Sequence, residues 1–268
     1  MSSNASQLAG SQRTLNAVGI VPARLDSSRL PRKMLLRESG QYLFEHTVRN
    51  LQAGHALQRV VLATDSEEIR QAAEGVGIEA LMTSIDHKSG TDRVQEAYTK
   101  LQIEGPETYD VVVNVQGDEP DVSAGDLNTL ISAFQDPEVE FATLWTHFSD
   151  PADAANHNTV KVVLDERGDA LYFSRSPIPN SIHQRGADTN GSDAQCYKRH
   201  IGVYAFRPDA LTRFCALPPG QLERLESLEQ LRWLEAGGRL RVLQAEHQPR
   251  GIDTAEDYLA FVNRQILS

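Results

Sequence analysis

The sequence predicts an α/β fold built on an open, mainly parallel sheet. In the first half of the chain, short β-branched runs alternate with longer amphipathic ones. Apolar residues are continuous in the short runs, as expected for parallel strands covered on both faces. Such strand–helix–strand units have right-handed crossovers, and their sheets bind ligands outside the carboxyl ends of the strands.

The first half of the chain supplies most of the predicted sheet. Strands are expected at 17–22, 58–64, 78–82 and 110–115. Helices are expected between them at 42–53, 66–75 and 92–102. Asp65 or Ser66 precedes the second helix and is a suitable N-cap.

The pattern changes after about residue 145. Two apolar runs, 159–164 and 170–175, flank a five-residue turn and predict a β-hairpin. The stretch 176–198 is rich in Pro, Asn, Gly, Asp and Ser, which is typical of a long loop. The remaining expected elements are a strand at 200–206, a helix at 221–236, a strand at 240–245 and a helix at about 254–266 capped by Thr254.

Length and composition limit the possible organisation. A chain of 268 residues corresponds to one or two domains, and no hinge-like composition divides it. We therefore expect a disordered tail at 1–16 and one domain at 17–268, with an embellishment at about 150–206. A formal net charge of −11 disfavours non-specific binding to nucleic acid or anionic lipid. The two cysteines are too few for a disulfide scaffold, and no apolar run resembles a signal peptide or membrane helix. These features predict a cytoplasmic protein.

The loop after the first expected strand is strongly basic. Four cations, at positions 24, 29, 32 and 33, lie within ten residues beside Ser27 and Ser28. The loop matches neither G-x-G-x-x-G nor G-x-x-x-x-G-K-[ST], which disfavours dinucleotide dehydrogenases and P-loop NTPases. A phosphate site and a solvated basic loop are equally good interpretations of this spacing.

Two carboxylates are expected where strands end. Asp118 follows the strand at 110–115, and Asp253 lies in a turn before the last helix. A divalent cation bound to a polyphosphate takes such oxygen ligands. The alternatives are a turn aspartate that bonds its own backbone and an acidic helix N-terminus.

Several polar residues have both a functional and a structural interpretation. Residues 87–93 open a helix whose free N–H groups can bind a base or phosphate, although simple capping is the more common role. Arg175 suits a substrate carboxylate or a surface ion pair, and His200 is a candidate site or core histidine. Glu223, Glu226 and Glu229 cannot all face one way on the helix at 221–236, and the pattern does not select one.

Taken together, eight segments resemble the 3-deoxy-manno-octulosonate (Kdo) cytidylyltransferase family. They run in family order from residue 20 to 258: IVPARLDSSRLPRKML, VVLATD, DHKSGTDRV, VVNVQGDEP, TVKVVLDERGDALYFSRSPIP, RHIGVYAFR, LESLEQLR and GIDTAEDY. The resemblance implies a Rossmann-like sheet of the nucleotide-sugar nucleotidyltransferase type, with a small hairpin embellishment for sugar binding and dimerisation. It also implies a homodimer.

The implied reaction is CTP plus Kdo giving CMP-Kdo and pyrophosphate, with Mg²⁺, for lipopolysaccharide synthesis. By motif, the resemblance assigns catalysis to Arg24, Lys33, Asp118 and Asp253, of which Asp118 and Asp253 would bind the metal. It assigns CTP binding to Arg24, Ser27, Ser28, Lys33, Ser89, Gly90, Thr91, Arg93 and Asp118. It assigns the sugar to Gln116, Arg175, His200, Tyr204, Glu229 and Gln230.

One departure and two alternatives accompany the resemblance. The family usually has Gly-Lys-Pro where this chain has Arg32, Lys33 and Met34, and the loss of Gly removes easy access to a positive φ. An 8-amino analogue of Kdo or another 3-deoxy-ulosonic acid is an alternative substrate. A non-catalytic CTP-binding regulator is a different class of alternative, which the retention of both metal carboxylates disfavours.

Overall fold

A nine-stranded mixed sheet forms the centre of the computed structural model, which describes residues 13–27, 29–105, 107–180 and 197–267. Its main path has the order β3-β2-β1-β4-β8-β5-β9. The strands are β1 (Ala17–Ala23), β2 (Arg59–Thr64), β3 (Ala80–Met82), β4 (Val111–Asn114), β5 (Phe141–His147), β8 (Lys198–Phe206) and β9 (Arg241–Gln244). On this path only β8 runs against its neighbours, so the expectation of a mainly parallel sheet is confirmed.

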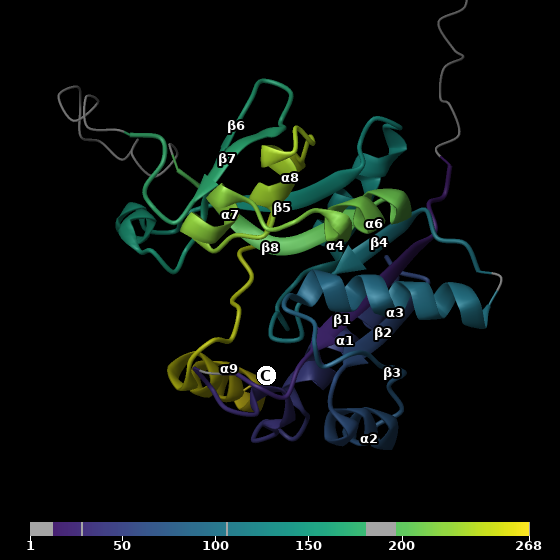
Figure 1. Ribbon diagram of the computed structural model, residues 1–268. Coiled ribbons are helices and arrows are strands. Elements are labelled where there is room, and N and C mark those ends of the chain that lie inside the picture. Colours follow the sequence, from purple (N-terminus) through teal and green to yellow (C-terminus); the bar gives the residue numbers. More distant parts are fainter. Residues whose placement is uncertain (1–12, 28, 106, 181–196, 268) are drawn as a thin grey trace, which may run out of the picture.

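Helices cover both faces of the sheet (Figure 1). Those packed on one face are α1 (Leu43–Ala53), α2 (Glu67–Gly75) and α4 (Ala124–Ser132). Those packed on the other are α3 (Gly90–Glu104), α6 (Pro208–Ala216) and the short pair α7 (Gln221–Glu226) and α8 (Leu231–Glu235). Every residue of β1 is buried, as its continuous apolar sequence requires for a strand between two helical layers.

The last helix closes one end of the molecule. α9 (Ala255–Leu267) buries Phe261 and Val262 in a small cluster with Leu43 of α1. The Thr254 hydroxyl accepts a hydrogen bond from the Asp257 amide, so the predicted N-cap is confirmed. Docking of α9 brings the preceding turn, which carries Asp253, to the loop after β1.

The predicted hairpin is also present. β6 (Lys161–Leu164) pairs antiparallel with β7 (Ala170–Ser174), and β6 also pairs with β8. The boundary expected for the embellishment is wrong at its end, because 198–206 is β8 and lies between β4 and β5 in the main sheet. Residues 13–16, assigned to the tail, belong to the fold: Arg13 pairs with Asp110 at 2.7 Å. Residues 1–12 lie outside the described part.

The single helix expected at 221–236 is wrong. Ser227 adopts a left-handed conformation with φ of 54°, which ends α7 before α8 begins. The carbonyls of Glu226 and Ser227, at this break, accept hydrogen bonds from Arg175 instead of helical amides. The break leaves Glu229 and Gln230 in the connection between two short helices.

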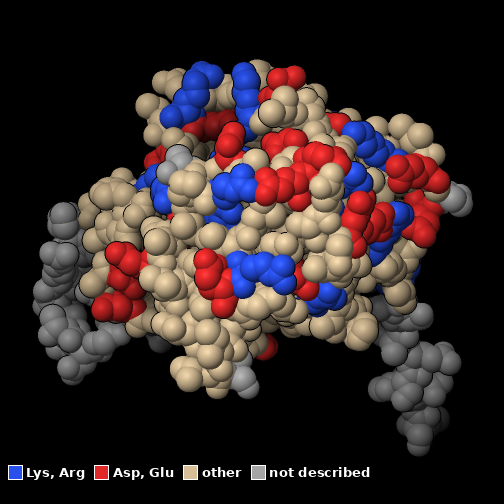
Figure 2. All heavy atoms as spheres, turned by 90° about the horizontal axis from the view of Figure 1, so that it is seen from below, with Lys and Arg blue, Asp and Glu red and all other residues tan. Residues whose placement is uncertain are grey.

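Surface charges are mixed on the side of the molecule seen from below. There, basic and acidic side chains lie next to one another (Figure 2). In the described part of the chain, no helix is both long and apolar enough to cross a bilayer.

Candidate active site

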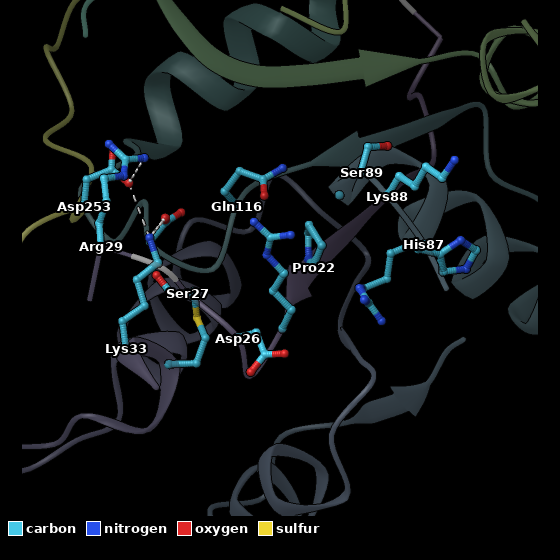
Figure 3. Close-up of a pocket in the computed structure, with 15 residues that line it drawn as sticks. Pro22, Asp26, Ser27, Arg29, Lys33, His87, Lys88, Ser89, Gln116 and Asp253 are labelled. Carbon is cyan, nitrogen blue, oxygen red and sulfur yellow. Dashed lines mark hydrogen bonds and ion pairs between the residues drawn. The ribbon is translucent and has the colours of Figure 1, made fainter. Parts of the chain in front are cut away.

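A cavity of about 300 Å³ opens at the carboxyl ends of β1 and β4 (Figure 3). The loop after β1 contributes Arg24, Asp26, Ser27, Arg29, Lys33 and Met34. The segment opening α3 contributes His87, Lys88, Ser89, Gly90 and Arg93, while Gln116 and Asp118 follow β4 and Asp253 precedes α9. The cavity thus lies at the sheet edge where parallel α/β folds bind ligands.

Lys33 joins the two predicted metal carboxylates at one end of this cavity. Its ammonium pairs with Asp118 and lies 3.4 Å from an oxygen of Asp253. It also donates to the carbonyl of Ile252 at 3.1 Å. Two carboxylates distant in sequence therefore converge on one cation, as predicted, although Asp253 lies in the turn before α9 and not at the end of a strand.

This pair fits the needs of Mg²⁺ bound to a polyphosphate. Among the residues described, no group of three His, Cys, Asp or Glu side chains forms a ready metal cage. Mg²⁺ in such sites takes one or two carboxylates and completes its shell with phosphate oxygens and water. Asp118 and Asp253 supply two carboxylates, and the Lys33 ammonium already lies between them.

Glu119 is a further carboxyl beside this pair, and the sequence pattern does not predict it. Burial raises its pKa to about 8, and the negative charges of Asp118 and Asp253 add to the rise, against the opposing effect of Arg199. A Cβ at Gly251 would come within 2.6 Å of the Glu119 carboxylate. A glycine at 251 thus lets the turn before α9 approach the loop after β4.

Arg32 stands in the basic loop where the family usually has glycine. It adopts the left-handed conformation directly, with φ of 57°, and forms an ion pair with Glu68. A side chain in this region costs free energy that glycine would not. The short helix η1 (Lys33–Leu35) begins immediately after it and directs Lys33 into the cavity.

The other end of the cavity is formed by the N-terminus of α3. Ser89 caps the helix by accepting a hydrogen bond from the Asp92 amide at 3.1 Å. A Cβ at Gly90 would lie 2.9 Å from the Gln116 amide nitrogen, so glycine allows these segments to touch. His87, Lys88 and Ser89 lie across the cavity from Arg29, Lys33 and Asp253 (Figure 3).

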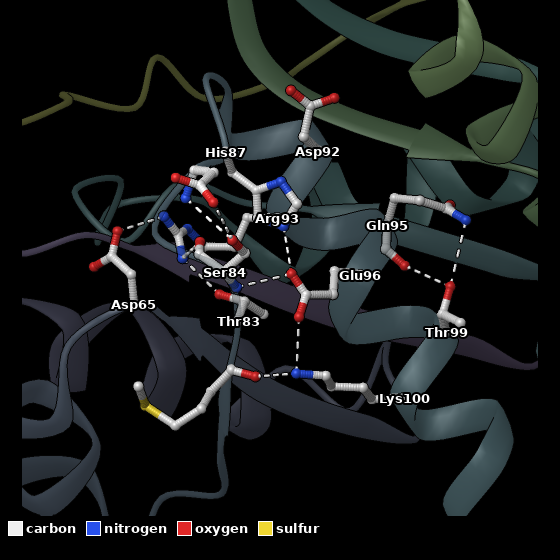
Figure 4. A network of polar contacts seen from close by, with 12 residues as sticks. Asp65, Thr83, Ser84, His87, Asp92, Arg93, Gln95, Glu96, Thr99 and Lys100 are labelled. Atoms are coloured by element: carbon white, nitrogen blue, oxygen red, sulfur yellow. Dashed lines mark hydrogen bonds and ion pairs between the residues drawn. The ribbon is translucent and has the colours of Figure 1, made fainter.

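A polar network fixes the segment that carries His87 and Lys88 (Figure 4). The Glu96 carboxylate accepts hydrogen bonds from the Ser84 amide, at 2.8 Å, and from the His87 ring. Arg93 is buried and pairs with Asp65 at 2.5 Å, while its second nitrogen donates to Thr83. Arg93 thus lines the cavity with a guanidinium already neutralised by Asp65.

A second, buried cluster lies between β8 and the α7–α8 connection. The Tyr204 hydroxyl donates to the Gln230 side-chain oxygen at 3.1 Å, and the His200 ring lies 5.6 Å from the Tyr204 ring. Burial raises the pKa values of Tyr204 and Glu229. Gln230 is 1% exposed, and its side-chain nitrogen has no partner. A buried unpaired donor is costly unless a ligand or water accepts its hydrogen bond.

Arg175 lies beside this cluster at the end of β7. Its guanidinium donates to the backbone carbonyls of Glu226, His157 and Ser227, at 2.8, 3.2 and 3.4 Å. No carboxylate in the described part of the chain forms an ion pair with it. A guanidinium has five N–H donors, so one on each terminal nitrogen stays available for an anion.

The structure thus sorts the predicted residues into two neighbouring groups. Those lining the cavity are Arg24, Ser27, Lys33, Ser89, Gly90, Arg93, Gln116, Asp118 and Asp253. Those in or beside the buried cluster are Arg175, His200, Tyr204, Glu229 and Gln230. Ser28 lies outside the described residues.

Two of the assigned residues lie apart from the other members of their sets. Gln116, assigned to the sugar, lines the cavity and donates to Asn114 at 3.1 Å. Thr91, assigned to CTP, does not line it: its side chain is fully buried and donates to Glu229. Its hydroxyl points into the sheet side of α3, because Asn114 of β4 donates to it at 3.1 Å. Thr91 therefore connects the two groups rather than facing the cavity.

His200 makes acid stability a test of this buried cluster. Burial lowers its pKa from 6.5 to about 3, so the folded protein resists protonating a ring that the unfolded chain protonates near pH 6.5. The stabilisation is complete above pH 6.5 and is lost as the pH falls toward 3. We expect this residue to lower the free energy of unfolding by about 2 kcal/mol between pH 6.5 and pH 5.

Urea unfolding at both pH values measures this loss. His200→Gln keeps a polar partner for Thr143, whose hydroxyl lies 2.9 Å from the ring, but does not titrate. The variant should lose less stability on acidification than the unmodified chain. Equal losses in the two proteins would contradict the buried, neutral histidine.

Comparison with known proteins identifies the class of protein to which this fold belongs. The family model described as "Cytidylyltransferase" matches residues 18–243. A 4-diphosphocytidyl-2C-methyl-D-erythritol synthase from Anaerococcus prevotii superimposes with a TM-score of 0.59 at 15% identity over 95% of this chain and 97% of its own, which shows a shared fold alone. The fold and the cavity define a nucleotidyltransferase of the cytidylyltransferase class.

More similar relatives identify the family. A 3-deoxy-manno-octulosonate cytidylyltransferase of Lawsonia intracellularis is 46% identical over 89% of this chain and 90% of its own length. The Porphyromonas gingivalis protein of the same name is 44% identical over 90% and 92%. A solved CMP:2-keto-3-deoxy-manno-octonic acid synthetase complexed with CTP has a TM-score of 0.84 at 37% identity, over 94% of this chain and 99% of that one. The chain belongs to the 3-deoxy-manno-octulosonate cytidylyltransferase family.

Proposed function

We propose that the cavity and the buried cluster together transfer CMP from CTP to the anomeric hydroxyl of Kdo and release pyrophosphate. This is the reaction of the family to which the chain belongs, and its product is the activated sugar for lipopolysaccharide synthesis. The convergence of Lys33, Asp118 and Asp253 beside a basic loop carries the proposal. That arrangement suits a triphosphate and its cation at the ligand-binding edge of the sheet.

Nucleotide binding is assigned to the whole cavity. Arg24, Ser27 and Lys33 would bind the triphosphate, and Ser89 and Gly90 at the α3 N-terminus would bind the cytidine. The separation of the basic loop from the α3 N-terminus across the cavity supports this orientation. Helix N-termini offer free N–H groups to a base or phosphate.

Asp118 and Asp253 would hold Mg²⁺ against the phosphates. When bound, the metal supplies positive charge to phosphate oxygens that become more negative during transfer. The lysine ammonium and Arg24 supply the same kind of stabilisation from the protein. The sugar hydroxyl attacks the α-phosphorus and loses its proton to solvent, the bond to the oxygen that bridges the α- and β-phosphates breaks, and pyrophosphate leaves with its electron pair. We assign no general base to any side chain.

The sugar acid would occupy the buried cluster. Arg175 retains N–H donors for its carboxylate, and Gln230 has an unpaired buried donor for a hydroxyl. Tyr204, His200 and Glu229 would complete the surroundings. The hydrogen bond from Thr91 to Glu229 places this cluster next to the α3 N-terminus, which supports transfer between adjacent ligands.

Pyrophosphate release with different nucleotides and sugar acids tests the proposed specificity. We expect CTP to be preferred over UTP by about 100-fold, because a site that pairs the cytosine amino group leaves partners unpaired against uracil. Kdo should be used well, with sialic acids much poorer. The same panel should include 8-amino-Kdo, which remains the alternative substrate. Equal use of CTP and UTP would contradict the assigned nucleotide specificity.

Arg175→Lys tests the assignment of the sugar carboxylate. Lysine keeps one charge but cannot form two parallel hydrogen bonds. We expect the KM for Kdo to rise about tenfold or more, with a much smaller change in the KM for CTP. Arg167→Lys, an exposed position in the turn of the same hairpin, is the matched control and should behave as the unmodified enzyme. Equal increases in both KM values would instead assign Arg175 to the phosphates.

Homodimer formation and a cytoplasmic location remain predictions of the sequence. We retain them as part of the proposal, together with the expectation that neither nucleic acid nor a membrane is a partner.

A further inference from the structure

Lys161 is a fully buried lysine that the reaction as described above does not use. It lies on β6 and is 0% exposed. Its ammonium donates to three backbone carbonyls, those of Asn156, at 3.1 Å, Thr159, at 2.7 Å, and Arg175. In the part of the chain that the structure describes, no carboxylate lies within ion-pair distance of it.

A charged group at such a position needs an explanation. Taking an ammonium out of water costs several kcal/mol, and an apolar side chain of similar volume commonly serves packing equally well. Here all three N–H donors of the ammonium are used, which compensates the burial but does not explain the choice of lysine. Burial and the nearby Arg175 guanidinium lower the pKa of Lys161, so its charge is held at a cost.

The three acceptors show what the ammonium connects. Two lie in the segment 156–159, and the third is the carbonyl of Arg175 at the end of β7. The same two segments meet again through the guanidinium of Arg175, which donates to the carbonyl of His157 at 3.2 Å. Lys161 therefore fixes the distance between Arg175 and one of the carbonyls that orient its guanidinium.

Glu226 binds the backbone amide of Arg175. Its carboxylate accepts hydrogen bonds from the Arg175 amide, at 2.9 Å, and from the Ser174 hydroxyl, at 2.7 Å. Both backbone polar groups of Arg175 are thus bound to charged side chains, its amide to Glu226 and its carbonyl to Lys161. Charge-assisted hydrogen bonds are stronger and shorter than neutral ones. The backbone at Arg175 is therefore held more tightly than the end of a strand normally is.

We propose that Lys161 is a positioning residue for the sugar acid: it orients the Arg175 guanidinium toward the substrate carboxylate by clamping the carbonyl of Arg175 to the 156–159 segment. The proposal rests on the assignment of Arg175 to that carboxylate. A planar guanidinium pairs with a carboxylate only over a narrow range of orientations, so a small rotation of the strand end weakens binding.

Lys161→Met tests the proposal because methionine keeps most of the stem and removes the ammonium. We expect the KM for Kdo to rise about tenfold while the KM for CTP changes less than about twofold. Lys198→Met, on the neighbouring strand β8, is the matched control. That lysine lies over the Trp145 ring rather than on backbone carbonyls, and its variant should leave both KM values unchanged.

A double-mutant cycle separates positioning from a merely structural role. In an Arg175→Ala background there is no guanidinium to orient, so Lys161→Met should then change kcat/KM for Kdo less than about twofold. A rise of the Kdo KM that persists in this background would overturn the proposal. So would an unchanged Kdo KM in a folded Lys161→Met protein, or equal rises for both substrates.

A second variant covers the possibility that Lys161→Met does not fold. Lys161→Gln retains N–H donors on a side chain one bond shorter, and should give a Kdo KM above that of the unmodified enzyme with an unchanged KM for CTP. A glutamine variant that folds and binds Kdo normally would count against the clamp. If Arg175→Ala alone leaves the Kdo KM unchanged, the assignment of Arg175 itself fails, which is a different result from failure of Lys161 to act through it.

Discussion

Asp118→Asn and Asp253→Asn should each reduce kcat by about 100-fold or more. Asparagine keeps the shape of the side chain but removes the charge that Mg²⁺ requires from its oxygen ligands. The two carboxylates meet at the Lys33 ammonium, so neither residue can substitute for the other in holding the cation against the phosphates. The Mg²⁺ concentration that gives half-maximal rate should also rise in both variants.

Steady-state rates measured across a series of Mg²⁺ concentrations check this prediction. Asp121→Asn is the matched control, since Asp121 lies in the same loop but pairs with Arg264 at 2.7 Å, away from the cavity. Loss of that partly exposed pair should cost less than about 1 kcal/mol of stability and leave kcat unchanged. Nearly normal turnover in both cavity variants would remove the metal assignment.

Lys33→Met should lower kcat/KM for CTP by about 100-fold. The side chain is largely buried, and methionine preserves its packing while removing the positive charge that lies between Asp118 and Asp253. A triphosphate entering the cavity would then meet two carboxylates without that compensating ammonium. The effect should fall on CTP, with little change in the KM for Kdo.

Initial rates at varied CTP and saturating Kdo measure this effect. Arg32→Met provides the comparison, because Arg32 is the preceding cation of the same loop but pairs with Glu68 and does not line the cavity. It should keep kcat/KM within about threefold of the unmodified enzyme. Equal losses in the two variants would mean that the loop acts through its total charge and that Lys33 has no specific role.

Much of the fold was predictable because the relevant signals are local. The continuous apolar runs of β1, β2 and β4 identify buried parallel strands, and Ser66 and Thr254 begin the helices that they precede. The strand order then places the basic loop and Asp118 at one edge, and the docking of α9 brings Asp253 to them. These residues meet in the structure because the fold, rather than their spacing, brings them together.

The elements that were not predicted have less distinctive sequences. β5 combines apolar residues with Thr143, Thr146 and His147, and its partners β8 and β9 are distant in the chain. α4 and α6 were not among the expected helices, although each is as long as α2. Their identities depend on packing against the sheet, which a local pattern does not record.

The differences at the site have tertiary causes. Leucines at three-residue spacing suggested one helix at 221–236. In the structure Ser227 interrupts that helix, and the Arg175 guanidinium donates a hydrogen bond to the Ser227 carbonyl at the break. The three glutamates consequently have different partners: Glu223 pairs with Arg232, Glu226 binds the end of β7, and Glu229 accepts from Thr91. Only the family resemblance selected Glu229 from the sequence. The sequence did not indicate that Lys161 is buried and bound to backbone carbonyls, because those carbonyls lie outside its own strand.

A ³¹P NMR measurement of the complete reaction distinguishes cytidylyl transfer from the binding of CTP without turnover. With CTP, Kdo and Mg²⁺, we expect the CTP signals to decline while one new phosphodiester signal and pyrophosphate appear in equal molar amounts. This outcome requires attack of the sugar on the α-phosphorus, and it excludes the alternative of a regulator that binds CTP without turnover. Intact CTP in the presence of Kdo, or cleavage to CDP and inorganic phosphate, would contradict a cytidylyl transfer at this cavity.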